Sequence, residues 1–119
     1  MTSKRNSVLR YGKDKYNTNP DYPWEKFPNY AVLRKGNSDK WFALIMDVPK
    51  DKLGLHGDEV VDIVDIKCDP HEVSDLQKKN GYLPAYHMNK EHWVTVLLDG
   101  TVPLDEVKHL IDKSYALTS

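Results

Sequence analysis

Apolar and polar residues follow one another along this chain in patterns that predict both strands and helices. Two apolar runs, at 31–35 and 40–48, flank a short polar stretch and are typical of a β-hairpin. Pro49 is expected to end the second of these strands because proline has no N–H to donate to a ladder. A third run at 60–67 is rich in β-branched residues, and a fourth follows His92 as far as the Asp99-Gly100 turn.

Helical spacing appears at both ends of the chain and once in the middle. Residues 3–16 predict a helix that Ser3 could cap, and residues 103–117 predict a final helix with one apolar stripe: Val107, Leu110, Ile111 and Tyr115. Between them, Asp69 at an N-cap, Pro70 at the first helical position and Glu72 three residues after the cap predict a short helix that ends at Asn80-Gly81.

The order of these elements predicts an α+β fold in one domain covering residues 1–119. Strands joined by short turns form an antiparallel sheet, and the N-terminal and C-terminal helices are expected to pack on one face of it. A proline-containing loop follows the first helix, and its aromatic side chains are expected to anchor it to the body of the protein: Tyr22, Trp24, Phe27 and Tyr30.

Composition narrows the class of protein. Cys68 is the single cysteine, so no disulfide forms within the chain, and this fits a reducing compartment. The sequence has no apolar run of membrane-spanning length and no signal peptide at its start, so we expect a cytoplasmic protein with no membrane partner.

Residues 1–50 hold ten Lys and Arg against five acids, whereas residues 51–119 hold seven against thirteen. DNA-binding domains usually carry a basic excess, so any DNA contact must be local.

Several blocks of this sequence together resemble the MmcQ/YjbR-like family: Tyr22-Pro23-Trp24, Lys40-Trp41-Phe42-Ala43, Lys67-Cys68-Asp69-Pro70, Pro84-Ala85-Tyr86-His87-Met88-Asn89-Lys90 with His92-Trp93, and Leu98-Asp99-Gly100. The resemblance covers roughly residues 8 to 118. It implies a bacterial protein with a frataxin-like (CyaY-like) α+β fold and a proposed DNA-binding role. It implies no catalytic residues.

The resemblance and the local basic residues together suggest a non-enzymatic DNA-binding module. The first hairpin would contact phosphates as a basic wing, and the Pro84–Trp93 block would add further donors. The candidate nucleic-acid-binding residues are Arg34, Lys35, Lys40, Lys50, Asn89 and Lys90. The alternative is a solvated hairpin whose charges discourage pairing at the sheet edge.

The segment from Tyr86 to Trp93 also supports a different hypothesis, a polar and aromatic cleft for a small ligand or a protein partner. On a strand, Tyr86, Met88 and Lys90 would face away from His87 and Asn89. The candidate cleft residues are Trp24, Tyr86, His87, His92 and Trp93. A buried bend that satisfies the neighbouring loop explains the same residues, and the sequence leaves both interpretations open.

Metal binding and catalysis find less support. His87 and His92 have zinc-like spacing, and Cys68 with His71 could complete a site, but a single thiolate is unusual among structural zinc ligands, so we expect no metal. Cys68 is interpreted as a small apolar filler between a strand and a helix. No nucleophile elbow, P-loop, dinucleotide-binding or zinc-protease motif occurs, and we expect no cofactor, no enzymatic activity and a monomeric protein.

Overall fold

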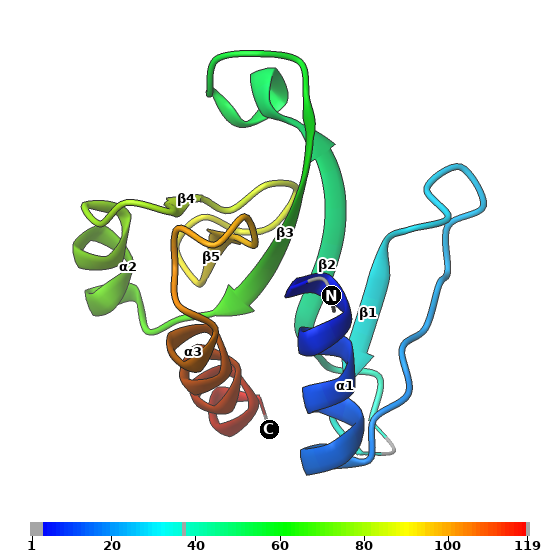
Figure 1. Cartoon of the computed structure of the whole chain (residues 1–119). Helices are drawn as coiled ribbons and strands as arrows, with labels where there is room; N and C mark the ends of the chain where they lie inside the picture. The colour runs from blue at the N-terminus through cyan, green and yellow to red at the C-terminus, as the bar shows by residue number, and fades with distance from the viewer. Residues whose placement is uncertain (1–3, 37, 119) are drawn as a thin grey trace.

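The computed structural model describes residues 4–36 and 38–118 and shows an α+β protein with a single five-stranded sheet (Figure 1). The elements in chain order are α1 (Lys4–Tyr16), β1 (Ala31–Arg34), β2 (Trp41–Pro49), the 3-10 helix η1 (Lys50–Leu53), β3 (Val60–Lys67), α2 (Pro70–Gln77), β4 (Tyr82–Pro84), β5 (Trp93–Leu97) and α3 (Leu104–Leu117). The predicted fold class is therefore confirmed.

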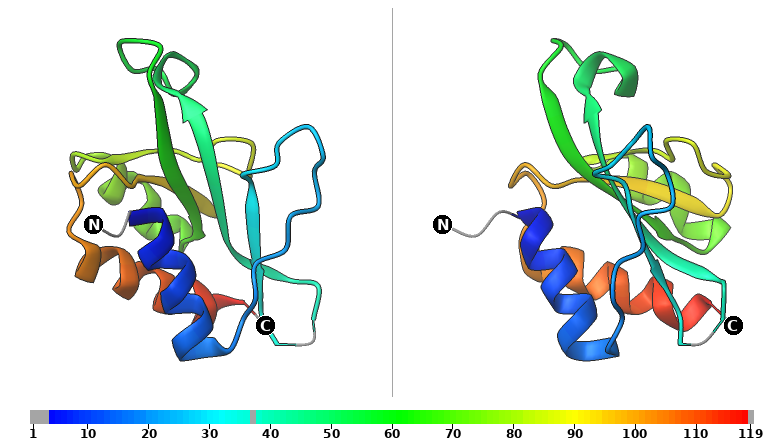
Figure 2. Two further views of the ribbon diagram at one scale, coloured as in Figure 1. Left: turned by 45° about the vertical axis from the view of Figure 1, so that its right-hand side comes forward. Right: turned by 90° about the vertical axis from the view of Figure 1, so that its right-hand side faces the viewer.

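The sheet has the strand order β1-β2-β3-β5-β4, and every neighbouring pair is antiparallel. The register between β1 and β2 shifts at Leu33/Arg34, so Phe42 and Ala43 both belong to the same face while Trp41 turns to the other. In Figure 2 the β2–β3 ribbon extends well beyond the helices and carries η1 at its tip.

One face of the sheet packs against the helices and holds the larger core. Val8 of α1, Val73 of α2 and Ile111 of α3 join the alternate strand residues that point toward them. The apolar stripe predicted for the last helix forms this contact, because Val107, Leu110 and Ile111 are all buried. Helix amphipathicity therefore positions the helical layer, as the sequence pattern predicts.

The other face, called here the second face, has a core of its own, and none of the three α-helices contributes to it among the described residues. Its buried residues come from the remaining alternate strand positions, together with Tyr30: Val32, Leu44, Met46, Val48, Val61, Ile63 and Leu97. Trp24 from the loop 17–30 and Tyr86 and Met88 from the loop 85–92 pack against this core. Two irregular segments thus form much of its cover, and loops of this kind often carry binding residues.

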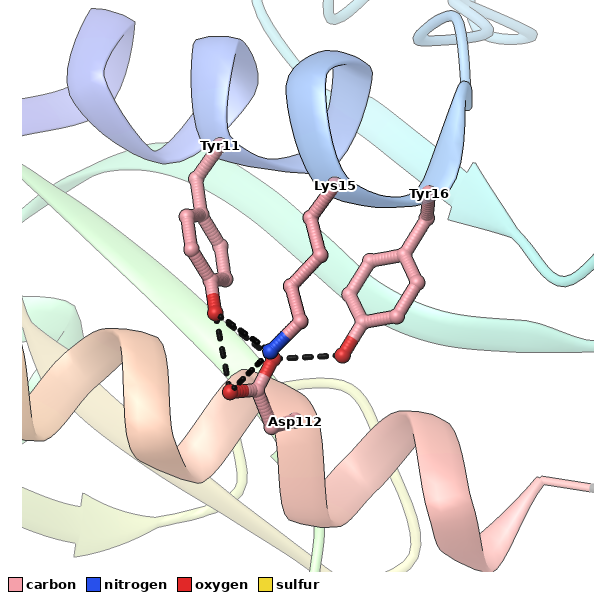
Figure 3. Close-up of polar contacts among 4 residues, drawn as sticks. All are labelled: Tyr11, Lys15, Tyr16 and Asp112. Atoms are coloured by element: carbon pink, nitrogen blue, oxygen red, sulfur yellow. Dashed lines mark hydrogen bonds and ion pairs between the residues drawn. The ribbon is translucent and has the colours of Figure 1, made fainter.

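A polar cluster joins the first helix to the last (Figure 3). Asp112 of α3 accepts hydrogen bonds from the hydroxyls of Tyr11 and Tyr16 and from the Lys15 ammonium of α1, the last at 2.9 Å. Burial alone would raise the pKa of Asp112, but these hydrogen bonds together lower it below its ordinary value. We call this cluster the clasp. It joins α1, near the start of the chain, to α3, near its end, and so holds the two helices of this layer together.

The chain departs from the sequence expectations at several elements. Residues 85–92 form turns and bends rather than a strand, so the alternating faces expected for Tyr86 to Lys90 do not occur. Asp69 caps α2 through a hydrogen bond from His71 N–H, but the Glu72 carboxylate pairs with Lys113 at 2.7 Å, so the reciprocal half of the capping box is absent.

Two further details differ from the expectations for the loops. Tyr22 and Phe27, expected to anchor the first loop, are 47% and 46% exposed, whereas Trp24 and Tyr30 pack against the core of the second face. The predicted helix cap at Ser3 and Asn37 of the hairpin turn lie outside the described residues. In the described part of the chain, every helix is too short or too polar to cross a bilayer.

Candidate functional site

The loop 85–92 is held in one shape by its own turn chemistry. The Asn89 side-chain oxygen accepts hydrogen bonds from the backbone N–H groups of Glu91 and His92, at 2.8 and 3.2 Å. The Asn89 carbonyl accepts from Trp93 N–H at 3.0 Å, which connects the turn to β5. His87 has a φ of 64°, a left-handed conformation that non-glycine residues rarely adopt. Such strain persists only where the surroundings fix it, and it is common at binding sites.

A hollow of about 290 Å³ lies on the second face between the two covering loops. We call it the aromatic hollow. It is lined by residues of the loop 17–30, the strand β2 and the loop 85–92: Trp24, Phe27, Tyr30, Trp41, Leu44, Met46, His87 and Met88. Aromatic side chains therefore form most of its walls, and aliphatic side chains of the sheet, Leu44 and Met46, form its floor.

The aromatic walls stand at steep angles to one another. The ring of Trp24 is nearly perpendicular to those of Trp41 and Tyr30, with centroid distances of 5.7 and 6.1 Å. Phe27 stacks on Tyr30 at 4.6 Å and carries the wall outward. Burial raises the pKa of Tyr30, with smaller effects from Tyr86 and Asp47, so its phenol stays neutral and its ring acts as an apolar surface.

A second hollow of about 380 Å³ lies on the other side of His87. It is lined by residues from the tip of the β2–β3 hairpin and from the start of the loop: Lys52, Leu53, Pro84, Ala85, Tyr86, His87 and Lys90. The rings of Tyr86 and His87 lie 4.0 Å apart between their centroids. His87 thus separates an aromatic compartment from one that carries two ammonium groups.

Asp65 is a fully buried carboxyl group in the middle of β3. Its Oδ1 accepts a hydrogen bond from the Thr95 hydroxyl, whose oxygen accepts one from Tyr86 N–H at 2.9 Å. Its Oδ2 is buried and has no hydrogen-bond partner among the described residues. Burial raises the pKa of Asp65 to about 7, and the Thr95 hydrogen bond and the charge of Lys90 oppose this rise. A charged group without full satisfaction is costly in a core and is often a sign of function.

Arg34 and Lys35, expected to contact DNA, are both used inside the protein. Arg34 donates to Asp21 Oδ2 and to the Asp39 carbonyl and lies 5.7 Å from the centre of the Trp41 ring. Lys35 donates to the carbonyls of Tyr115 and Thr118, at 3.0 and 2.6 Å, and so satisfies the end of α3. Both charges therefore have structural roles.

The remaining basic residues lie in separate places. Lys40 precedes β2, whereas Lys50 follows it, and nine strand residues span roughly 30 Å. Lys50 also faces Glu59 at 3.9 Å. Lys90 is exposed beside the second hollow, and Asn89 uses its side-chain oxygen in the turn. The six candidates thus do not form one basic face.

A smaller group of cations gathers near the start of β2 instead. The pKa of Lys67 is lowered by burial and then by the charges of Lys40 and Lys35, so three ammonium groups share one region. The Lys67 ammonium also lies 5.6 Å from the centre of the Trp93 ring. This group was not evident in the sequence because Lys67 is far along the chain from the other two.

Comparison with known proteins identifies the family of this chain. The sequence model of the YjbR family matches residues 13–117. The chain belongs to the YjbR family. The uncharacterized protein YyaQ of Bacillus subtilis (strain 168) is 49% identical over 115 residues, which cover 96% of this chain and 97% of YyaQ. The uncharacterized protein YjbR of Escherichia coli (strain K12) is 41% identical over 54 residues, which cover 44% of this chain and 45% of YjbR.

Solved structures of similar proteins share the architecture. A crystal structure of a protein from Pseudomonas syringae has 51% identity and a TM-score of 0.94, and the match covers 100% of both chains. A Deinococcus radiodurans protein with a DUF419 domain has 26% identity and a TM-score of 0.72, with 98% of this chain and 78% of that chain covered. The predicted membership of the family is thus confirmed.

The five predicted cleft residues of this YjbR-family chain separate into different environments. Trp24 and His87 line the aromatic hollow, whereas Tyr86 lines the neighbouring one. Trp93 is buried beside Lys67, and His92 is exposed and accepts Cys68 N–H through its backbone carbonyl. The structure therefore brings together part of the predicted set, around His87.

Sequence reasoning missed Trp41 and Asp65. Trp41 begins a strand whose apolar run continues without a break, so its face could not be assigned before the β-bulge was known. Asp65 interrupts a β-branched run three residues after Asp62, and this spacing places the two acids on opposite faces of the sheet. The sequence did not indicate that loops cover the second face of the sheet, on which both residues lie.

The possible metal ligands of this YjbR-family chain stay apart. Among residues 4–36 and 38–118, no three His, Cys, Asp or Glu side chains lie close enough to hold an ion. Cys68 is buried and unpaired, and burial raises the pKa of its thiol, with a smaller contribution from Glu72. Its position between β3 and α2 agrees with its interpretation as a filler.

Proposed function

We propose that this protein is a non-enzymatic binding module that takes an apolar or aromatic group of a small ligand into the aromatic hollow. The observation that carries the proposal is a hollow of about 290 Å³ walled by the rings of Trp24, Tyr30 and Trp41 and floored by a rigid sheet. Ligand pockets are typically concave and mostly apolar, with a few polar groups at fixed positions.

The surroundings of the hollow support the same function. His87 is at its rim in a strained conformation, and the Asn89 turn holds the loop from which it projects. The compartment beyond His87 offers the ammonium groups of Lys52 and Lys90 to a polar tail of the ligand.

The proposal is tested by a titration with indole and 3,3-dimethylbutan-1-ol, followed through the backbone and indole N–H resonances in NMR spectra. We expect saturable shifts at Trp24 and Trp41. Trp24→Leu should remove most of the binding because it removes one wall. Tyr22→Leu is the matched control, since Tyr22 lies in the same loop, is 47% exposed and does not line the hollow. Absence of saturable shifts with both probes at about 10 mM would refute the proposal.

DNA is a second candidate partner, and the cluster of Lys35, Lys40 and Lys67 supports it. Ammonium groups that repel one another gain from a bound phosphate. Fluorescence anisotropy with duplex DNA at low salt tests it. Lys40→Gln with Lys67→Gln should weaken binding and reduce its salt dependence by about two phosphate contacts. The matched control, Lys78→Gln with Lys79→Gln, changes two exposed lysines after α2 and should leave binding unchanged.

A further inference from the structure

The angles between the aromatic walls of the hollow suit a rounded group better than a flat ring. A flat ring stacks best between parallel faces. Trp24 instead stands at 84° to Trp41 and at 79° to Tyr30, so each pair forms a corner. Corners of this kind present several π-faces to one compact group, which is how aromatic cages surround a methylated ammonium ion.

A buried carboxyl group lies next to the floor of the hollow. Asp65 of β3 pairs directly with Leu44 of β2, and Leu44 is part of the floor. Because Asp65 belongs to the same alternate set of β3 residues as Ile63, its side chain is on the second face, under the loop that carries Met88. The carboxylate does not line the hollow, but low-dielectric surroundings let its charge act at short range.

Other charges near the hollow leave this carboxylate without full compensation. The residues that line the hollow include no Lys, Arg, Asp or Glu. Lys90 is the charged group that faces Asp65 from the covering loop, and it acts through space while Oδ2 keeps no hydrogen-bond partner among the described residues. Arg34 lies against Trp41, but Asp21 and Asp39 offset its charge.

From these three observations, we propose that the aromatic hollow binds a methylated ammonium group of a small molecule and that Asp65 supplies the counter-charge. This inference rests on the proposed function and names the ligand class of the same site. Ring faces attract the cation and exclude water, and the nearby carboxylate gives the preference for a positive charge over a neutral group of equal shape.

The test compares two probes that differ in one atom. Choline carries a trimethylammonium group, and 3,3-dimethylbutan-1-ol carries a tert-butyl group of nearly the same shape without the charge. Titrations followed by NMR at pH 8 keep Asp65 ionised. We expect choline to bind about tenfold more tightly than the neutral alcohol, and its affinity should fall with Trp24→Leu.

Two variants of one strand then locate the source of this preference. Asp65→Asn keeps an acceptor for Thr95 but removes the charge, and it should reduce the preference for choline to about twofold or less. Asp62→Asn is the matched control, because Asp62 also lies in β3 but pairs with Arg5 of α1 at 3.9 Å on the helical side. The preference of Asp62→Asn for choline over the neutral alcohol should equal that of the unmodified protein.

Each outcome has one meaning. Equal or tighter binding of the neutral alcohol overturns the ammonium inference while the proposed binding hollow stands. Failure of choline and of the neutral alcohol to bind overturns the ammonium inference, and failure of indole as well overturns the proposed function. An unchanged preference in Asp65→Asn overturns the role of Asp65. A peptide with trimethyllysine separates the two sources of the group: binding within a few-fold of choline supports a free ligand, and much tighter binding refutes it in favour of a protein side chain.

Discussion

Asp65 is a residue through which the stability of this fold is expected to depend on pH. Its pKa is raised to about 7, above the ordinary value of 3.8, so the folded protein holds a proton that the unfolded chain has lost. The stability contributed by Asp65 therefore falls as pH rises between these values, and the full penalty is present above pH 7. Buried ionisable groups with shifted pKa values are common at functional sites.

We expect Asp65→Asn to remove this pH dependence. Urea unfolding at pH 5 and pH 8 should show that the original protein loses on the order of 2 kcal/mol more stability over this range than the variant does. Asp75→Asn removes an exposed carboxylate of α2 and controls for the loss of one charge. Parallel pH profiles for the original protein and Asp65→Asn would contradict the assignment.

At the residue scale, the sequence predicts which polar residues matter better than it predicts what each of them contacts. Asn89 was expected to donate to DNA, but its oxygen closes a turn, and Lys35 was expected on a free wing, but it satisfies the end of a helix about 80 positions away. Residue type and sequence neighbours were enough to single out Asn89 and Lys35. Their partners depend on tertiary contacts, which no spacing rule reports.

Among the elements, the loop 85–92 depends most on one side chain. Asn89→Ala would leave the N–H groups of Glu91 and His92 without their acceptor, and we expect a loss of about 1 kcal/mol in stability and weaker binding in the aromatic hollow. Asn89→Asp keeps the oxygen and should retain both. If Asn89 instead served as a donor to DNA, Asp would be the worse substitution, so thermal unfolding with ligand titration of both variants decides the role.

The clasp between α1 and α3 is the second element with a testable energy (Figure 3). Asp112→Asn weakens three hydrogen bonds that join these helices, and a loss of about 1–2 kcal/mol is expected at pH 7. Since the pKa of Asp112 is lowered, this stability is present above the unfolded value of about 4 and is lost as pH falls through the folded value. Denaturant unfolding at pH 7 and at pH 2.5 should show the difference between the two proteins shrink.

The elements themselves were largely predictable because their signals are local. The helix cap at Asp69, the β-branched run of β3 and the stripe of α3 each depend on neighbouring residues, and all three elements are confirmed. The loop 85–92 was assigned partly to a strand because its polar and aromatic residues imitate a two-residue period. Turn formation by Asn89 and the left-handed His87 override that pattern.

At the scale of the whole molecule, the different coverings of the two faces of the sheet explain where the aromatic hollow arises. Helices seal one face with side chains at regular spacing, whereas loops cover the second face incompletely and leave the aromatic hollow. The family and the α+β fold followed from the sequence, but the hollow needed the relative position of three segments. The frataxin-like comparison stays a prediction.

The edges of this sheet predict that the protein is a monomer. An unpaired edge strand is the usual route to association. At one edge, Asp21 bridges Val32 of β1 with backbone bonds of 3.0 and 2.8 Å and covers part of that strand. At the other edge, β4 has only three residues and ends in Pro84, which cannot extend a ladder.

The apolar surface leads to the same expectation. Among the described residues, the large exposed apolar side chains are Tyr22, Phe27, Val60 and Leu117, which come from separate elements apart from the first two. Such isolated residues do not form an interface of the size that stable dimers need. Light scattering should give a mass close to 13.8 kDa at concentrations up to about 100 μM. A mass that doubles with concentration would contradict this expectation. Phe27 also lines the aromatic hollow. A dimer that disappears in Phe27→Ser would therefore place the contact beside the proposed site.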